Sequence, residues 1–333
     1  MKRWYLALLL LLTLLLSGCT AMVSPLTHAA ATLIPGTDPV LPEAQAPDSL
    51  STRDTATLYF RYLDEPYLAP ETRTITLSPS RPYELSLLTE LLSGPGTRSA
   101  DLTALFPAGT RVLATSTQGR TLFVTLSQEI MNAYPDEPSS WRSDAFYQAE
   151  VPLRRKLCMQ SLVATVTENC DVDRVQVLVE QTGQAADSLR LRARYFMLDP
   201  DPNALVGPMT RDESLLLSPH TTMDVILSLL VAQDWQRLYA YVAGRDPSTG
   251  MERVSYQDFM TAMGNLPAVT DYRFSGGSIT KEGMQATFTL SASLLTHSGQ
   301  ALEAEGCILR LGRDNGLWRI TLSQLTGWLE DLT

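Results

Sequence analysis

Histidine is the side chain most often used for acid–base or metal chemistry near neutral pH, and this sequence of 333 residues contains three. His28 lies in a stretch rich in Ala and Pro, His220 follows a proline, and His297 lies at an expected turn between strands. None has a cysteine, a carboxylate or a second histidine at the spacing of a metal site or a catalytic triad. We therefore predict surface positions for them, with no catalytic residue, metal site or cofactor.

Two acidic segments have letters that suggest a site but do not meet its requirements. A calcium-binding loop needs a bidentate glutamate at its twelfth position, and the segment 246–257 has Gln257 there. Glu303 and Glu305 would share one face of a strand, where paired carboxylates can do acid–base work. We favour a solvated face that protects a strand edge. Motifs for nucleotide binding and for a nucleophilic serine are absent from the sequence.

Four aromatic residues in the last third of the chain recur at helical and strand spacing: Tyr239, Tyr241, Tyr272 and Trp318. Aromatic side chains at such periods usually pack in a core. We predict core positions for them and keep an apolar pocket as the alternative.

The clearest chemical signal is a cysteine that follows a short apolar run. Lys2 and Arg3 precede about 13 apolar residues at 4–16, and the letters LSGC occupy positions 16–19. A spanning helix needs roughly 20 apolar residues, so this layout favours an export signal. Its end resembles the lipobox of bacterial lipoproteins, which implies cleavage before Cys19 and attachment of diacylglycerol and palmitate there. An ordinary secretory signal with a chance cysteine is the alternative.

The chain is acidic, with 26 basic and 36 acidic residues. Removal of residues 1–18 leaves 24 basic residues and a formal net charge of −12. Such a surface repels phosphate backbones and anionic headgroups, which excludes nucleic acid as an expected partner. We expect a protein on the extracytoplasmic face of the cell membrane, held there by the lipid on Cys19.

The three other cysteines do not form a disulfide framework. Cys158 falls in an expected helix that reaches about residue 168, so Cys170 would lie roughly 18 Å along the chain. Bridged Cα atoms lie within about 7 Å of each other, and we therefore predict that Cys158 is a buried apolar residue. A bridge between Cys170 and Cys307 would have to join two domains and stays open as an alternative.

Composition divides the chain into successive parts. Residues 19–52 are rich in Ala, Pro and Thr and lack periodicity, as a disordered tether does. Asp and Pro are concentrated near residues 199–203, which indicates a second connector. The expected parts are a signal peptide at 1–18, a lipidated cysteine and tether at 19–52, a domain at 53–183, a linker at 184–218 and a domain at 219–333.

The first domain alternates strand and helix patterns. Leu88 and Leu92 belong to a helical stripe, and Ser93 and Gly94 end it. Around it we expect strands at 57–62, 72–77 and 175–179, a hairpin at 111–126, and helices at 85–92 and 148–168 with Leu157, Val163 and Val166 buried. One sheet packed with two helices is an α+β arrangement.

Several sequence blocks of this domain occur in a family order: TLYF at 57–60, LLTELLSGP at 87–95, FPAGTRV at 106–112, LFVTLSQEI at 122–130, and LVATVTENCDVDRVQVLV at 162–179. They resemble the GerMN domain of sporulation and germination proteins and of other envelope lipoproteins. The resemblance implies a small α+β interaction module, similar to ring-building domains, that assembles or positions complexes around the developing spore.

The second domain begins with helices and ends with strands. Met223, Ile226, Leu230 and Val231 suit one helix face, which residues 235–242 would extend. After a short helix at 256–263 we expect only strands, at 284–292, 302–311 and 317–322, with a turn at 314–316. A helical start followed by a curved antiparallel sheet is similar to NTF2-like domains.

Together these patterns predict a non-enzymatic envelope lipoprotein that serves as an interaction or assembly module in sporulation or germination. Envelope proteins are the expected partners, and a homo-oligomer is an open alternative. A second reading is a ligand-binding or enzymatic lipoprotein that uses a cavity in the C-terminal domain. A third is a cell-wall accessory protein of growing cells.

Overall fold

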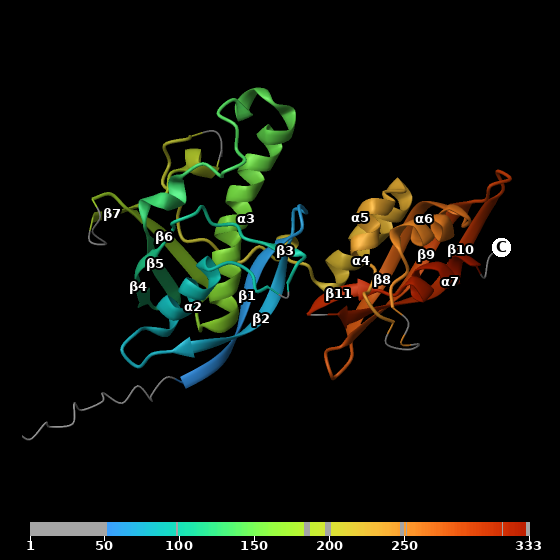
Figure 1. The fold of residues 1–333 in the computed structure, drawn as a ribbon, viewed down its shortest axis with the longest axis horizontal. Helices are drawn as coiled ribbons and strands as arrows, with labels where there is room; N and C mark the ends of the chain where they lie inside the picture. The colour runs from blue at the N-terminus through green and yellow to red at the C-terminus, as the bar shows by residue number, and fades with distance from the viewer. Residues whose placement is uncertain are drawn as a thin grey trace, which may run out of the picture. The chain divides into compact units, whose positions relative to one another are not determined.

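The computed structural model of the protein describes residues 52–97, 99–182, 187–196, 201–246, 250, 252–314 and 316–330. Within these ranges the chain is α+β, with sheets and helices in its N-terminal part and helices followed by an antiparallel sheet after residue 218 (Figure 1). The expected signal peptide, Cys19 and the tether up to residue 51 lie outside the described residues.

The first sheet is built on a long hairpin. β1 (Thr52–Tyr62) and β2 (Leu68–Leu77) are antiparallel, and the short β3 (Leu102–Thr103) pairs with the end of β1. From Leu58 to the end of β1 every residue is buried. A strand that is buried on both faces does not alternate apolar with polar residues. The apolar and aromatic residues of this segment agree with that pattern.

A second sheet has the order β4-β5-β6-β7, with strands at Val112–Gln118, Thr121–Leu126, Arg174–Glu180 and Ser188–Arg190. β4 and β5 form the predicted hairpin, and β5 is parallel to β6. Parallel neighbours need a long crossover, which a helix supplies here. The prediction of one sheet in this domain is wrong, because the strands form two separate sheets.

Two helices pack against these sheets. α2 (Tyr83–Leu92) buries Leu87, Leu88 and Leu91 on one face. It ends as predicted, with Gly94 at a φ of +86°, a backbone conformation that glycine adopts without strain.

The crossover helix is α3 (Ala145–Asn169), and Asp144 caps it by accepting hydrogen bonds from Phe146 N at 2.9 Å and Tyr147 N at 3.3 Å. Its buried residues include the expected ones: Leu157, Cys158, Val163 and Val166. Neither α3 nor any other helix in the described ranges is long and apolar enough to cross a bilayer.

Polar side chains on α3 explain why only the short β3 pairs with β1 on the edge opposite β2. Thr165 Oγ1 accepts a hydrogen bond from Tyr59 N at 3.1 Å, and Ser161 Oγ donates one to Tyr59 O at 2.6 Å. One turn on, the Asn169 side chain accepts from Thr57 N at 2.9 Å and donates to Thr57 O at 2.7 Å. The helix therefore bonds the backbone edge that a further strand would otherwise occupy.

The segment expected as a linker, 184–218, contacts the first domain at several of its described positions. β7 pairs with β6, and Val175 and Met209 exchange backbone hydrogen bonds of 2.8 and 2.9 Å. Leu191 and Tyr195 are both buried. This segment thus adds a strand and apolar side chains to the domain that precedes it.

The second part of the chain starts with α4 (Pro219–Ala232), α5 (Trp235–Ala240) and α6 (Tyr256–Gly264). A single extended helix was expected over the first two of these, and that prediction is wrong. Gln233 adopts a left-handed φ of +54° and ends α4, after which the Asp234 side chain accepts from Arg237 N and caps α5. Val231, which was expected on the buried face, is 37% exposed.

The C-terminal sheet has the order β11-β10-β9-β8, with strands at Leu317–Ile320, Ala301–Asp314, Gln285–Leu295 and Ala268–Ile279. Residues 286, 288, 290 and 292 of β9 are buried as expected, but Met284 precedes the strand and is 52% exposed. Register shifts bend the sheet, one of them at Gly276, where a Cβ would lie 2.9 Å from Thr287 O.

A helix closes the chain where only strands were expected. α7 (Leu322–Glu330) buries Leu325, Trp328 and Leu329. Together with Leu322 these residues follow helical spacing, which the strand-rich context before them obscured.

Contacts continue across residue 218. Arg237 Nε donates to Glu65 Oε1 at 2.7 Å, and Tyr62 OH donates to Ala240 O at 2.8 Å. The described residues accordingly belong to one compact unit.

Candidate functional site

The residues first considered for chemistry are not brought together. Cys19 and His28 lie outside the described residues. The His220 ring lies 4.7 Å from the Phe274 ring, and His297 Nε2 lies 3.1 Å from Gly264 O. The two described histidines thus contact different elements of the fold.

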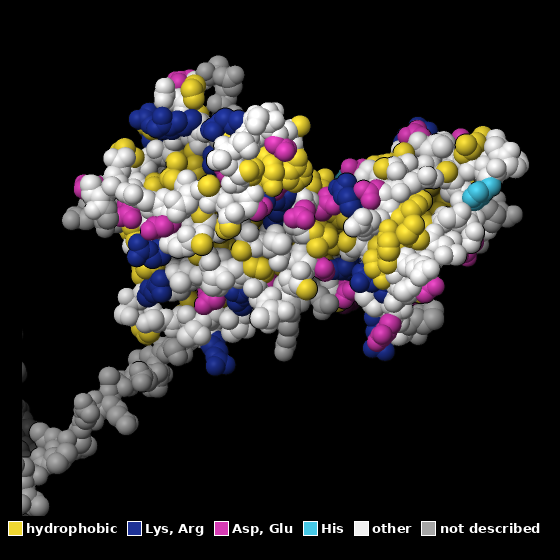
Figure 2. Space-filling view, turned by 45° about the horizontal axis from the view of Figure 1, so that its top comes forward, with side chains coloured by type: hydrophobic (Ala, Val, Ile, Leu, Met, Phe, Trp, Pro, Cys, Tyr) yellow, Lys and Arg dark blue, Asp and Glu magenta, His cyan; other side chains and the backbone are white. Residues whose placement is uncertain are grey.

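The acidic candidates Glu303 and Glu305 lie on the exposed surface of β10. Glu303 Oε2 accepts from Ser293 Oγ at 3.1 Å on the exposed surface of the sheet, and Glu305 is also exposed. Among the described residues no group of three His, Cys, Asp or Glu side chains could hold a metal ion. Figure 2 shows acidic and basic side chains interspersed on the face that it draws.

The aromatic candidates contact neighbouring side chains. Tyr241 and Trp318 are buried, which confirms the core prediction for these two. The Tyr241 ring lies 5.3 Å from the Tyr62 ring, and burial raises the pKa of both phenols, that of Tyr62 to about 12. Tyr272 is half-buried, and its hydroxyl donates to Asp224 Oδ1 at 2.9 Å.

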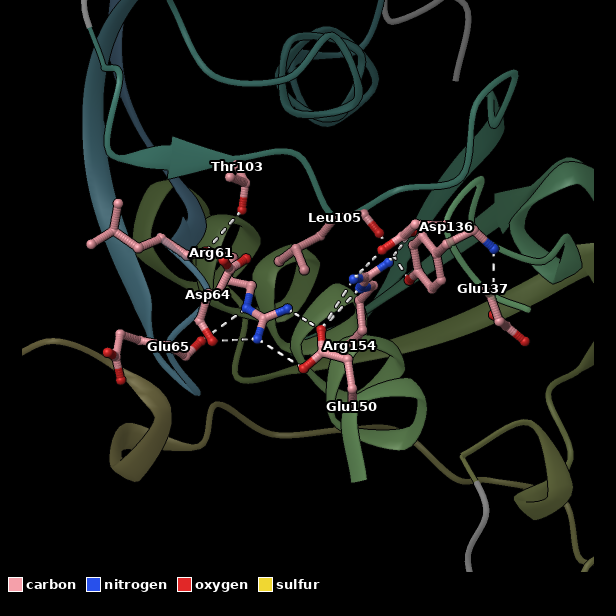
Figure 3. Close-up of polar contacts among 11 residues, drawn as sticks. Arg61, Asp64, Glu65, Thr103, Leu105, Asp136, Glu137, Glu150 and Arg154 are labelled. Atoms are coloured by element: carbon pink, nitrogen blue, oxygen red, sulfur yellow. Dashed lines mark hydrogen bonds and ion pairs between the residues drawn. The ribbon is translucent and has the colours of Figure 1, made fainter. Parts of the chain in front are cut away.

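A buried charge network joins the end of β1 to the start of α3 (Figure 3). Arg61 is 3% exposed, and its guanidinium forms a bidentate ion pair with Glu150, one contact of which is 3.1 Å. Its remaining donors reach Glu65 O at 2.9 Å and Asp64 O at 2.6 Å. All three nitrogens of this arginine therefore have acceptors, which is the condition under which a buried charge is tolerated.

A second arginine extends the network towards the loop before α3. Arg154 donates to Glu150 Oε1 at 3.2 Å and makes a bidentate pair with Asp136 at 2.6 and 2.9 Å. Its guanidinium also lies 4.7 Å from the centre of the Tyr134 ring. The Arg154 hydrogen bonds hold the pKa of the Asp136 carboxyl below its ordinary value, and the same pairing raises the pKa of Arg154.

This pKa shift gives a pH dependence with a defined sign. Because the Asp136 pKa is lower in the folded chain than its ordinary 3.8, the pair stabilises the protein above that pH and stops doing so as pH falls further. We expect the melting temperatures of wild type and Asp136→Asn to differ at pH 6 and to converge near pH 2, as measured by circular dichroism. A difference that persists at pH 2 would show that the amide has another effect.

The cations and carboxylates of this network are paired with each other. The network therefore holds the end of β1 against the start of α3 and does not present an unpaired charged side chain for a reaction. Sequence reasoning missed it. The only local signal is the Glu150 and Arg154 spacing of four residues, which favours a pair on one helix face. Its main link joins residues 89 positions apart, Arg61 and Glu150.

Beside this network the start of α3 presents an unusually exposed aromatic. Phe146 is 66% exposed, and its ring makes an edge contact with Tyr147 at 5.1 Å. Exposed aromatic side chains on a rigidly held element are common anchors of protein interfaces. We name Phe146 and Tyr147 the α3 tip, a candidate contact surface for a protein partner.

The fold and this arrangement define an α+β module with a long crossover helix, α3. Residues 57–184 match the family model Germane, described as sporulation and spore germination. The chain therefore carries a GerMN (Germane) domain at these residues, as the sequence blocks indicated. No curated protein is similar to the chain in sequence.

Solved structures resemble the chain at low identity. The tandem GerMN domains of the sporulation protein GerM from Bacillus subtilis are 17% identical, with 49% of this chain and 48% of that chain covered and a TM-score of 0.32. The first of these domains alone is 18% identical, with 47% and 98% covered and a TM-score of 0.29. A Clostridium perfringens protein described as a candidate lipoprotein is 15% identical, with 49% and 89% covered and a TM-score of 0.26. The chain thus spans about half the length of the GerM tandem.

Proposed function

We propose that this protein is a non-enzymatic lipoprotein, held on the extracytoplasmic face of the cell membrane by lipid on Cys19, whose GerMN domain assembles envelope proteins in sporulation or spore germination. The observation that carries the proposal is the Germane match at residues 57–184. The lipobox-like letters at 16–19 support the anchor. We also propose that residues 219–333 are an NTF2-like domain, because helices precede a bent antiparallel sheet there.

Lipidation is tested by intact-mass analysis and cell fractionation of the native protein beside Cys19→Ala. We expect the native protein to carry diacylglycerol and to sediment with membranes, and the variant to be unlipidated and released, because two acyl chains are needed for a stable anchor. A native protein without lipid would refute the anchor and leave the GerMN domain unaffected.

Assembly is tested by a photo-crosslinking residue placed at Phe146, with the same residue at Ile279 as the control. Ile279 is a fitting control because it is 52% exposed and lies on β8, outside the residues that match the Germane family. We expect discrete crosslinked envelope partners from position 146 in sporulating cells only. Equal products from both positions, or none from either, would contradict the interaction role of the α3 tip.

The alternative function is small-ligand binding or catalysis in the C-terminal part. A groove of about 490 Å³ there is lined by polar side chains that include Arg310, Arg313 and Gln324. Its volume falls in the range of ligand sites, which favours testing metabolite binding to the purified protein. A role in wall synthesis of growing cells is the third candidate, and protein abundance in growing and sporulating cells distinguishes it.

A further inference from the structure

Among the described residues, a buried carboxylate at the end of β6 has no partner. Glu180 is 7% exposed, and its Oε2 atom is inaccessible to solvent and accepts no hydrogen bond. Within the described ranges its side chain makes no ion pair either. A buried charge without a partner is costly, so such a group in a folded protein calls for a ligand that supplies the missing donor.

Glu180 lines a groove whose other charged residues are arginines. The groove has a volume of about 620 Å³, and Arg190, Arg192 and Arg194 line it together with Glu180. Figure 2 shows dark blue side chains at the upper left, the region of β7 and of the 3-10 turn Ala193–Phe196. All three arginines are exposed, and Arg192 is bonded only to a backbone oxygen, that of Asn203 at 2.9 Å, among the described residues.

The groove is held open by elements of the fold. In the β6–β7 pair Glu180 lies opposite Ser188 and Leu178 lies opposite Arg190, so Glu180 and Arg190 share a face. Tyr195 OH donates to Ile130 O at 3.3 Å and fixes one wall. Met131 and Leu189 also line the groove and are 46% and 50% exposed, which adds apolar surface.

These charges restrict what the groove can take. A simple anion would meet the Glu180 carboxylate, and a simple cation would meet three guanidinium groups. A fitting ligand has a cationic donor for the buried carboxylate and anionic groups for the arginines, which pair well with carboxylates. A long phosphate chain could pair with the arginines, but it has no cationic donor for Glu180 and therefore does not fit the groove.

We propose that this groove binds an acidic peptide through its free amino terminus. The terminal ammonium pairs with Glu180, acidic side chains pair with Arg190, Arg192 and Arg194, and apolar atoms contact Met131 and Leu189. The site goes beyond the assembly role proposed above, and it depends neither on Cys19 nor on the α3 tip.

The test uses three tripeptide probes and the unlipidated full-length protein at pH 7, with binding measured by calorimetry. Gly-Glu-Glu offers both charges, its N-acetylated form lacks the ammonium, and Gly-Gln-Gln amide lacks the carboxylates. We expect Gly-Glu-Glu to bind, and each of the other two to bind about tenfold more weakly, the size of one charged hydrogen bond. Equal affinity for all three probes, or no binding of Gly-Glu-Glu, would overturn the proposal.

Variants separate the two halves of the site. We expect Glu180→Gln to abolish the preference for a free amino terminus and to leave the melting temperature of the free protein unchanged or higher, because an unpaired buried charge is removed. Arg192→Ala is expected to reduce the preference for Glu over Gln. Glu305→Gln and Arg273→Ala remove exposed charges on the C-terminal sheet and should change neither preference.

One outcome distinguishes a binding carboxylate from a structural one. A lower melting temperature of Glu180→Gln in the absence of peptide, with both probe preferences intact, would show that Glu180 already has a partner within the fold. The proposal would then be wrong, whatever the fate of the lipoprotein assignment.

Discussion

Replacing Glu150 by alanine is expected to lower the free energy of unfolding by about 3–5 kcal/mol, the usual effect of leaving a buried charge without its partner. Arg61 and Glu150 have side chains that are only 4% and 11% exposed, so little solvent can replace the lost carboxylate. The variant also loses the contact of Arg154 with Glu150. Urea denaturation followed by circular dichroism measures the change.

Two further variants show that the effect belongs to the buried pair. Arg61→Met combined with Glu150→Met removes both charges, and we expect most of the lost stability to return, because apolar side chains of similar volume tolerate burial. Asp173→Ala breaks an exposed pair with Arg120 and should leave the midpoint nearly unchanged. If Glu150→Ala and Asp173→Ala lower the free energy of unfolding equally, the buried network of Figure 3 does not stabilise the fold more than an exposed ion pair does.

The second large effect is expected where α3 bonds the edge of β1. Thr165→Val keeps the side-chain shape but removes the acceptor of Tyr59 N, and we expect a loss of about 1–3 kcal/mol from the buried, unbonded amide. Adding Asn169→Leu removes both bonds to Thr57 and should lower stability further. Because the strand edge is then open, we also expect concentration-dependent association in size-exclusion chromatography.

Thr167→Val is the matched control for this edge. Thr167 Oγ1 donates to Val163 O of its own helix at 2.9 Å and, among the described residues, makes no hydrogen bond to the backbone of β1. It should therefore have a smaller effect than Thr165→Val and leave the protein monodisperse. Equal losses in the two variants would indicate that the helix, and not the strand edge, depends on these hydroxyls.

Local patterns in the sequence determined most of the elements. The leucine spacing predicted α2, and the Ser-Gly end of that stripe predicted where it stops. The hairpin of β4 and β5, the burial of Cys158 and the alternation of β9 were also predicted. Periodicity and turn preferences depend on residues that are close in the chain. Elements that rest on them can therefore be predicted from a single sequence.

The resemblance to a family indicated the identity of the first domain, which periodicity alone does not indicate. The ordered blocks between residues 57 and 179 indicated the GerMN domain, and the Germane match at 57–184 agrees with them. Periodicity did not predict the break at Gln233, where the expected long helix ends. It also did not predict α7, which begins at Leu322 directly after a run of strands.

Only the tertiary structure decided how distant residues pair. Whether β1 is followed by a strand or by a polar helix face depends on Tyr59 and Thr165, which are 106 positions apart. The pairing of Arg61 with Glu150 and the lack of a partner at Glu180 likewise arise from the packing of separate elements. The type of a residue determines its structural propensity and its charge. Which distant residue becomes its partner depends on what is buried beside it, and burial exists only in the folded chain.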